Sequence, residues 1–516
     1  MDLLPVFEEL TNNLDDAAVI EEGKKVLEKF ICENEKTFEY SELDAKCHNK
    51  LLDKIFLLIH QHPLSLECIK ITRLLSRDKN LVLNIKNVDF YMDIFAKLLK
   101  EKAELGSNIL LSKIETVKCL CNWVYLSDKV RIYFKENNLI KLMIDEMKIT
   151  DQSVTDYYFY EIRLMFLMSA LEVSERNQML EDDAVATLVK VMTDAVLANS
   201  KSDDSGLHIP IICEVLKALF NITLELSNST SPSIVDDCLH LVCILQNMLV
   251  SFYPFDSDEK DDLLTHIAHM MVNMPKTALD GLVINSNKDE EEQFCGHPVT
   301  YENFEMRSVI VFLDALKLRI QVDNYIEMKE KTMAILTAFC YVCRVNPVIR
   351  KYLKREILPP LQPSDIRPEQ FKDLRGNIVQ LMTTVDVPLK NMAADFLFVL
   401  CKENSQRLIR YAGYGNSAGF LASRGLMIPG MSDADGDYSS DELTDVEDDV
   451  DPVTGAIPKP KDTSFESLSE SEKEAEMEKL MCMFDRLKEL NVIKPAAVDK
   501  DGKITELETG NNQPGP

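Results

Sequence analysis

One eight-residue pattern occurs twice in the chain: Glu115-Thr-Val-Lys-Cys-Leu-Cys-Asn122 and Glu214-Val-Leu-Lys-Ala-Leu-Phe-Asn221 both follow Glu-x-x-Lys-x-Leu-x-Asn, 99 residues apart. Around both copies, apolar residues recur every three or four positions, which places them on one face of an α-helix. They are Leu110, Ile114, Val117, Cys121 and Val124 around the first copy, and Ile212, Val215, Leu219, Ile222 and Leu226 around the second. The pattern predicts two equivalent helices.

The same helical period recurs along most of the chain. It is found at 49–60, 66–76, 89–100, 159–172, 238–250, 307–320, 329–345 and 389–401, between short polar breaks, while strand-like alternation is nearly absent. A spacing of 99 residues accommodates two helical repeats of roughly 40–47 residues with insertions. We therefore predict an all-α fold, an armadillo- or HEAT-like α-solenoid. A large helical bundle would show the same period and is the alternative.

Composition restricts the class of protein. The 516 residues are 46% hydrophobic and 28% charged, with 57 Lys and Arg against 86 Asp and Glu, a net charge of −29. A negative net charge of this size repels the phosphate backbone of nucleic acids, so we expect no nucleic-acid partner. The 13 cysteines, most of them in apolar surroundings, are typical of a reduced compartment. With no signal peptide and no long apolar run, we expect a cytoplasmic chain without a membrane span.

The pattern changes sharply towards the C-terminus. We expect a helical repeat domain over 1–426, interrupted by a long surface loop at 276–303, and then an acidic disordered regulatory segment over 427–465. An amphipathic helix is predicted at 466–491, after the capping box Ser469-x-x-Glu472, and a disordered tail at 492–516. The apolar stripe of that helix consists of Met477, Leu480, Met481, Phe484 and Leu487.

No motif of an enzyme fits. The glycines at 413, 415 and 419 lack phosphate-loop spacing and read as a turn between helices. Cys340-x-x-Cys343 has no second ligand pair and reads as buried core, and His266-x-x-His269 lacks the Glu of a zinc-protease helix. We therefore expect no catalytic residues, no metal and no cofactor.

Recognition of another protein is the remaining class of function. In solenoids the innermost helices line a concave groove, where an Asn amide can bond to the backbone of a ligand. Asn122 and Asn221 hold equivalent places in the two matched repeats. Arg73, Arg77 and Arg163 could add a cationic lining suited to a carboxylate terminus.

A second basic group points to regulation. Arg350, Lys351, Lys354 and Arg355 fall on one predicted helix, where the alternative is an ordinary solvated face. Ser439 and Thr444 each precede a Glu by three residues, the context preferred by an acidophilic kinase of the casein-kinase type. Phosphate adds roughly −1.5 to −2 charge and pairs well with Arg. We hypothesise that the phosphorylated segment folds back onto these four basic residues.

Several stretches together resemble the synembryn family, also called resistance-to-inhibitors-of-cholinesterase 8 proteins. The most specific stretch is Arg410-Tyr-Ala-Gly-Tyr-Gly-Asn-Ser-Ala-Gly-Phe-Leu-Ala-Ser-Arg-Gly-Leu426. The others include Leu358-Pro-Pro-Leu361, the run from Ala393 to Asn404, the run from Tyr438 to Glu447, and Met483-Phe-Asp-Arg-Leu487.

The resemblance implies a chaperone and non-enzymatic guanine nucleotide exchange factor for heterotrimeric G-protein α subunits. Such a protein binds the GDP-bound monomeric α subunit, stabilises its nucleotide-free state and releases it on GTP binding. Carried onto this sequence, Arg73, Arg77, Asn122 and Asn221 would belong to the groove for the C-terminal helix of the α subunit. The helix near 469–490 would form a second contact, on the nucleotide-binding domain.

The resemblance also implies that Ser439 and Thr444 match the family's phosphorylated pair, although Ser440 and Leu443 make this segment less acidic than the family pattern. We expect a monomer, compatible with recruitment to the cell cortex or plasma membrane. The rival is a generic armadillo peptide-binding adaptor. Adaptors of that class usually carry Trp beside each groove Asn, whereas this chain has Trp123 beside Asn122 and Ile222 beside Asn221.

Overall fold

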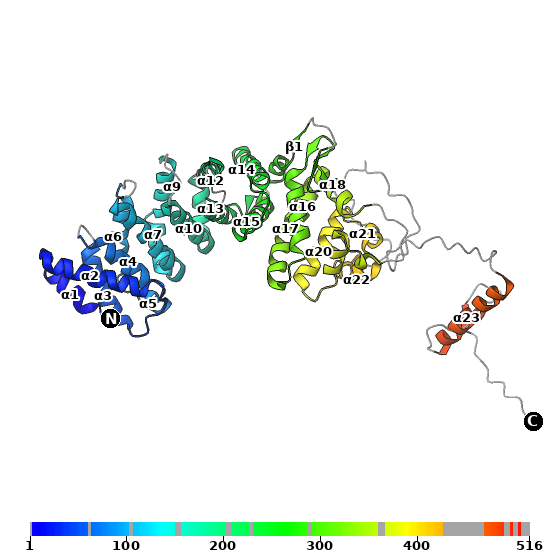
Figure 1. Ribbon diagram of the computed structural model, residues 1–516, viewed down its shortest axis with the longest axis horizontal. Helices are drawn as coiled ribbons and strands as arrows, with labels where there is room; N and C mark the ends of the chain where they lie inside the picture. The colour runs from blue at the N-terminus through cyan, green and yellow to red at the C-terminus, as the bar shows by residue number, and fades with distance from the viewer. Residues whose placement is uncertain are drawn as a thin grey trace, which may run out of the picture.

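Helices follow one another along a curved array from residue 4 to residue 423 in the computed structural model (Figure 1). The structure describes residues 3–59, 63–102, 107–149, 156–201, 208–226, 231–286, 292–359, 367–426, 469–489, 496–498 and 504–506. The array is an α-solenoid, so the fold class predicted from the helical period is confirmed. The predicted acidic segment at 427–465 lies outside the described residues.

Groups of two or three helices form the repeats. The N-terminal part contains α1 (Leu4–Asn12), α2 (Ala17–Asn34), α3 (Ala45–Ile59), α4 (Ser65–Leu75), α5 (Lys79–Leu83), α6 (Val88–Lys100), α7 (Asn108–Leu126), α8 (Asp128–Glu136), α9 (Leu139–Ile149), α10 (Asp156–Leu171), α11 (Val173–Glu181), α12 (Ala184–Lys201) and α13 (Ile209–Ile222). The C-terminal part contains α14 (Pro232–Ser251), α15 (Asp258–Asn273), α16 (Arg307–Arg319), α17 (Tyr325–Val345), α18 (Pro347–Ile357), α19 (Leu374–Leu381), α20 (Val387–Leu400), α21 (Ser405–Ala412) and α22 (Tyr414–Ser423).

One helix from each repeat joins a continuous layer. We call it the inner layer; its helices α4, α7, α10, α13, α15, α17 and α20 each pack against the next. Figure 1 shows α10, α13, α15 and α17 along the lower edge of the array, beneath α9, α12, α14 and α16. The apolar faces predicted from the period point into the core, where Val117, Leu219 and Ile222 are buried.

The polar breaks between helical segments act as caps. Ser107 Oγ accepts from the Leu110 N–H (3.2 Å) at the start of α7, and Asp386 Oδ1 accepts from the Leu389 N–H (3.0 Å) at the start of α20. Asn346 Oδ1 accepts from the N–H groups of Val348 (3.0 Å) and Ile349 (3.1 Å). These bonds satisfy amides that a helix leaves open at its start, so each break ends one helix and begins the next.

Within the described ranges one helix, α14, is long and apolar enough to cross a membrane by length and composition alone. Its side chains Leu241, Val242, Leu245 and Leu249 are fully buried in the core. Its contacts with α12, α16 and the 3-10 helix η2 (Lys276–Leu282) account for this apolar face.

The prediction of a long surface loop at 276–303 is wrong in part. The segment begins with η2, whose Ala278, Leu279 and Leu282 are buried. Short antiparallel strands follow: β1 (Ile284–Asn285), β4 (Thr300–Tyr301) and β5 (Phe304–Glu305) form one sheet, and β2 (Gln293–Phe294) pairs with β3 (His297–Pro298). Two-residue strands are too short to produce a visible alternation in sequence.

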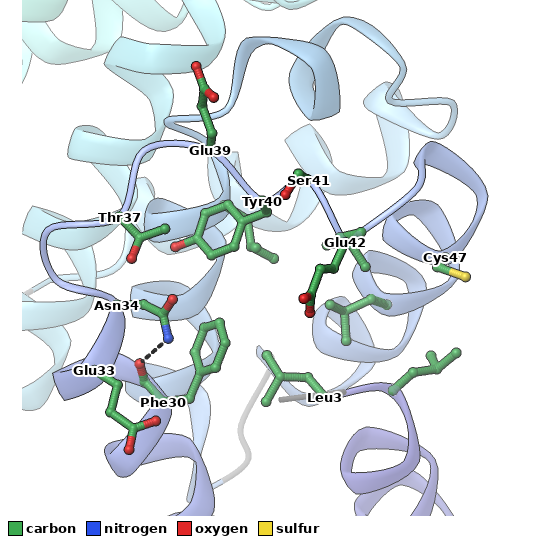
Figure 2. Close-up of a pocket in the computed structure, with 14 residues that line it drawn as sticks. Leu3, Phe30, Glu33, Asn34, Thr37, Glu39, Tyr40, Ser41, Glu42 and Cys47 are labelled. Carbon is green, nitrogen blue, oxygen red and sulfur yellow. Dashed lines mark hydrogen bonds between the residues drawn. The ribbon is translucent and has the colours of Figure 1, made fainter.

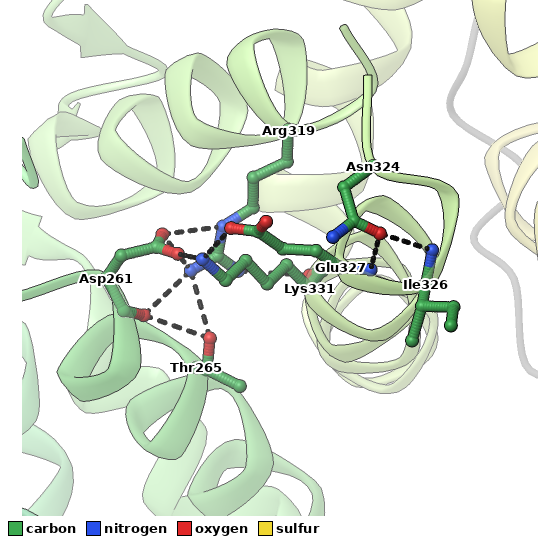
Figure 3. A network of polar contacts seen from close by, with 7 residues as sticks. All are labelled: Asp261, Thr265, Arg319, Asn324, Ile326, Glu327 and Lys331. Atoms are coloured by element: carbon green, nitrogen blue, oxygen red, sulfur yellow. Dashed lines mark hydrogen bonds and ion pairs between the residues drawn. The ribbon is translucent and has the colours of Figure 1, made fainter. Parts of the chain in front are cut away.

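A buried charge network fixes the join between α15, α16 and α17 (Figure 3). The Arg319 guanidinium is 4% exposed and donates from Nε to Asp261 Oδ1 at 2.9 Å. Its other nitrogens donate to Asp261 O (2.9 Å), Thr265 Oγ1 (3.0 Å) and Lys331 O (3.0 Å). Lys331 Nζ lies 2.6 Å from Asp261 Oδ2 and 2.6 Å from Glu327 Oε1. Three consecutive helices are thereby held by one carboxylate.

The C-terminal part holds the predicted helix and one feature that differs from prediction. α23 (Glu470–Glu489) begins directly after Ser469 and is drawn apart from the array in Figure 1. Within the region predicted as a disordered tail, β6 (Ala496–Val498) pairs antiparallel with β7 (Ile504–Glu506), so that prediction is wrong for these residues.

Candidate partner-binding face of the inner layer

The Glu-x-x-Lys part of the repeated pattern builds a charge cluster between neighbouring inner helices. On α7, Glu115 Oε1 lies 2.8 Å from Lys118 Nζ, and Glu115 Oε2 lies 2.6 Å from Arg73 Nε on α4. The cluster recurs on α13, where Glu214 Oε1 lies 2.5 Å from Lys217 Nζ and 3.8 Å from Arg163 Nη1 on α10. Each glutamate thus joins a lysine of its own helix to an arginine of the preceding inner helix.

Aromatic rings of α10 lie beneath both lysines. Lys118 Nζ lies 4.9 Å from the centre of the Tyr160 ring, and Lys217 Nζ lies 5.7 Å from that of Phe166. A cation over an aromatic face is attracted by the ring's quadrupole. The two lysines, which the sequence did not single out as site residues, therefore complete a cationic line with Arg73 and Arg163, whose charge Glu115 and Glu214 neutralise in part. The repeated pattern itself was the signal that could have identified them.

The predicted arginines differ in accessibility. The Arg163 side chain is 48% exposed. Arg73 and Arg77 are held by Glu35, at the end of α2: its carboxylate lies 3.2 Å from Arg73 Nη2 and 3.7 Å from Arg77 Nη2. Arg77 Nη1 also donates to Glu35 O at 2.6 Å, and the Phe38 ring covers its guanidinium at 5.3 Å. The structure therefore brings Arg73 and Arg77 together, with an internal acid already bound to both.

The predicted asparagines connect successive inner helices. Asn122 Nδ2 donates to Ser76 Oγ (2.8 Å), just after α4. Asn221 Nδ2 donates to Ser169 Oγ (3.2 Å) and Phe166 O (3.3 Å) on α10. Asn122 thus commits one of its two N–H groups within the chain, and Asn221 directs its nitrogen to two acceptors. The expectation that these amides donate to and accept from a ligand stays a prediction, with Oδ1 as the group that none of these bonds uses.

A third asparagine, Asn273 on α15, was missed. Its Nδ2 donates to Phe220 O (2.7 Å) and Thr223 Oγ1 (3.3 Å) at the end of α13. The two charged positions of the pattern are here occupied by His266 and His269, whose rings lie 6.5 Å apart. Burial, with the charge of Lys217, lowers the pKa of His266 to about 4. His266-x-x-His269 is thus a neutral version of the repeated pattern.

The basic residues of α18 form an incomplete surface patch. Arg350 is 1% exposed. Lys351 Nζ lies 3.3 Å from Glu302 Oε1. The Arg355 guanidinium lies over the Tyr301 ring at 4.6 Å, and Arg355 Nε lies 2.9 Å from Glu356 Oε1. Phosphate docking here, which also involves Lys354, stays a prediction because Ser439 and Thr444 lie outside the described residues.

The stripe on α23 is open to solvent. Met477, Leu480 and Met481 are each more than half exposed. The helix also carries Phe484 and Leu487, whose side chains lie outside the described set. An exposed apolar stripe of this kind is typical of a surface that meets another protein.

Residues considered for enzyme chemistry take structural places. Gly413 adopts φ of 81° where α21 ends and α22 begins, a turn as predicted. Cys340 and Cys343 are buried free thiols, as predicted. Among the described residues, no group of three or more His, Cys, Asp or Glu side chains is placed to hold a metal ion. Trp123 is buried against Phe56 and Phe95, so it does not line the groove as an adaptor's Trp would.

Known proteins share both the sequence and the fold. A crystal structure of an engineered protein matches with a TM-score of 0.50 and 14% identity, over 84% of this chain and 86% of its own. The chaperone Ric-8A of Xenopus tropicalis is 31% identical over 94% of this chain and 93% of its own length. That of Gallus gallus is 30% identical over 95% of each chain. The chaperone Ric-8 of Drosophila pseudoobscura pseudoobscura is 30% identical over 80% of this chain and 75% of its own.

The model of the Ric8 family, described as guanine nucleotide exchange factor synembryn, matches residues 66–503. This range contains the repeated pattern, the inner layer from α4 onwards and α23. The chain belongs to the synembryn (Ric8) family of chaperones and guanine nucleotide exchange factors.

Proposed function

We propose that the inner layer from α4 to α13 binds the C-terminal helix of a GDP-bound, monomeric G-protein α subunit. The chain then stabilises the nucleotide-free α subunit until GTP releases it, and it assists the folding of new α subunits. The observation that carries this proposal is the cationic line of Arg73, Lys118, Arg163 and Lys217 on adjacent inner helices. A helix that ends in a carboxylate matches such a line in charge.

The arginine pair offers an exchangeable position for that carboxylate. Glu35 is 55% exposed, although it pairs with Arg73 and Arg77. The Arg73 and Arg77 side chains are 12% and 18% exposed, so an incoming carboxylate can replace Glu35 by taking over its ion pairs with both guanidinium groups. The oxygens of Asn122 and Asn221 would then accept hydrogen bonds from the bound helix.

Nucleotide exchange follows from differential binding and needs no catalytic side chain. A protein that binds the empty α subunit more tightly than the GDP form shifts the equilibrium towards GDP release. A groove that withdraws the terminal helix has this effect if that helix supports the guanine pocket. GTP reverses the shift by restoring the state that the groove binds poorly.

Three further elements belong to this proposal. The stripe on α23 would contact the nucleotide-binding domain of the α subunit. A casein-kinase-type kinase would phosphorylate Ser439 and Thr444, which would dock on α18. The chain would act as a cytoplasmic monomer, with recruitment to the plasma membrane where receptors meet G proteins.

A peptide titration tests the site. We expect Arg163→Ala to weaken binding of a peptide from the C-terminus of the α subunit by about tenfold, as for loss of one hydrogen-bonded charge. Arg176→Ala is the matched control, because Arg176 on α11 donates to Ser169 O within its own repeat. Equal affinity of the Arg163→Ala and wild-type chains, with melting temperatures unchanged, would refute this placement of the helix.

A further inference from the structure

The N-terminal end of the solenoid contains a cavity of about 460 Å³ (Figure 2). It lies between α1, the end of α2, the segment 35–44, α3 and α4. Its volume falls within the range that small-molecule sites occupy in proteins. Arg73 of the cationic line and the neighbouring Arg77 lie close enough to act electrostatically on Tyr40 in its lining, but the function proposed above does not use the cavity.

Two aromatic rings and several aliphatic side chains form its walls. Phe30 and Tyr40 are stacked, with ring centres 6.4 Å apart and planes 24° apart. Leu3, Leu43 and Leu51 complete the apolar lining. Such walls favour a ligand with an apolar body.

The charge of the lining has one sign. Glu33, Glu39 and Glu42 line the cavity, and none of the lining residues is Lys, Arg or His. Figure 2 shows the Glu42 carboxylate pointing between Tyr40 and Leu3, whereas Glu39 points away. Glu33 lies 3.8 Å from Lys29, but Glu42 makes no ion pair within the described part of the chain. The lining itself is acidic, although the guanidinium groups of Arg73 and Arg77, outside it, also act on Tyr40.

The remaining polar groups are an amide and several hydroxyls, each of which can accept a hydrogen bond. Asn34 Nδ2 donates to Phe30 O at 3.0 Å, which leaves Asn34 Oδ1 to accept. The Tyr40 hydroxyl is closed to water and has no hydrogen-bond partner among the described residues. Burial raises the pKa of this phenol, so it stays neutral. A neutral Tyr ring, a Phe ring, an amide oxygen and a carboxylate together suit an ammonium group, which carries donors only.

We propose that this cavity is a binding site for a small organic ammonium ion with an apolar body. The ammonium lies at Glu42 and over the Tyr40 ring, and the apolar body lies against Phe30 and the leucines. An anion at that place would be repelled by Glu42. A neutral apolar molecule of the same shape would lose the contact with Glu42.

Phenethylamine and its neutral analogue 2-phenylethanol test the site on the full chain. By ligand-observed NMR titration we expect phenethylamine to bind saturably with a Kd of about 1 mM, a realistic affinity for so small a molecule. We expect 2-phenylethanol to bind about tenfold more weakly, the difference made by one charge-assisted contact. Raising the salt concentration should weaken binding of the amine and leave binding of the alcohol unchanged.

Two substitutions on the exposed surface locate the binding. Glu42→Gln should weaken the binding of phenethylamine by about fivefold. Glu22→Gln, an exposed glutamate of α2 outside the cavity, should leave its affinity unchanged. Absence of saturation, equal affinity for the two probes, or equal weakening by both substitutions would each overturn the proposal. Melting curves of both variants verify that the fold is intact.

Discussion

Replacing Asp261 by Ala is expected to destabilise the solenoid by about 3 kcal/mol. The substitution removes the carboxylate that lies 2.9 Å from Arg319 Nε and 2.6 Å from Lys331 Nζ. Arg319 is 4% exposed, so water cannot replace the lost partner. Burial lowers the pKa of the Arg319 guanidinium, and the charge of Asp261 opposes this effect.

The magnitude follows from the contacts that survive. Breaking a buried ion pair by removing one partner costs about 3–5 kcal/mol. Arg319 keeps its bonds to Thr265 Oγ1 and Lys331 O, and Lys331 keeps Glu327. We therefore expect the lower end of that range.

Urea unfolding followed by circular dichroism, together with hydrogen exchange across α15–α17, measures this effect. Glu330→Ala on α17, which removes an exposed carboxylate, is the control and should change stability by less than about 0.5 kcal/mol. An Asp261→Ala chain within about 1 kcal/mol of the wild type would refute the reasoning that this join depends on the carboxylate that pairs with the buried Arg319.

Three further predictions concern the core and the groove. Glu161 is fully buried, and burial raises the pKa of its carboxyl to about 8. The folded chain therefore binds a proton that the unfolded chain loses above its ordinary value near 4.5, so stability falls as pH rises from 4.5 to 8. Glu161→Gln should gain at least about 1 kcal/mol at pH 8 and flatten this dependence, whereas an unchanged pH profile in thermal melts would contradict it. Asn273→Ala removes two hydrogen bonds to the end of α13 and should lower the free energy of unfolding, measured in urea, by about 2 kcal/mol. A decrease below about 0.5 kcal/mol would show that these two bonds contribute little to stability. Glu35→Ala removes the carboxylate from Arg77 and leaves Arg73 with its ion pair to Glu115; it should tighten binding of the same C-terminal peptide about threefold, so weaker binding would mean that Glu35 positions the arginines instead.

Local pattern predicted the helices well because burial of an apolar face repeats at a fixed period. Both copies of Glu-x-x-Lys-x-Leu-x-Asn became inner helices, α7 and α13, with Asn122 and Asn221 in equivalent places. The equivalent segment of α15, from His266 to Asn273, was not recognised in the sequence, because His266 and His269 replace the Glu and the Lys of the pattern. Without the charges the pattern lost the feature by which it was recognised.

Local sequence pattern could not identify contacts between residues that are distant in the chain. The pairing of Glu35 with Arg73 joins residues 38 positions apart, and only the packing of α2 against α4 brings them together. For the same reason the sequence could not tell that the asparagine amides bond within the chain. Residue type identified the candidates for the groove, and tertiary contacts decided which of their atoms remain available.

The inner layer is proposed to bind the C-terminal helix of the α subunit and to stabilise the nucleotide-free state of that protein. GDP release from a purified α subunit, followed with a fluorescent GDP analogue, tests this most directly. We predict faster release when the chain is added, suppression by excess C-terminal peptide, and little acceleration by the Arg163→Ala chain. An unchanged GDP release rate, or acceleration that the peptide does not suppress, would contradict it.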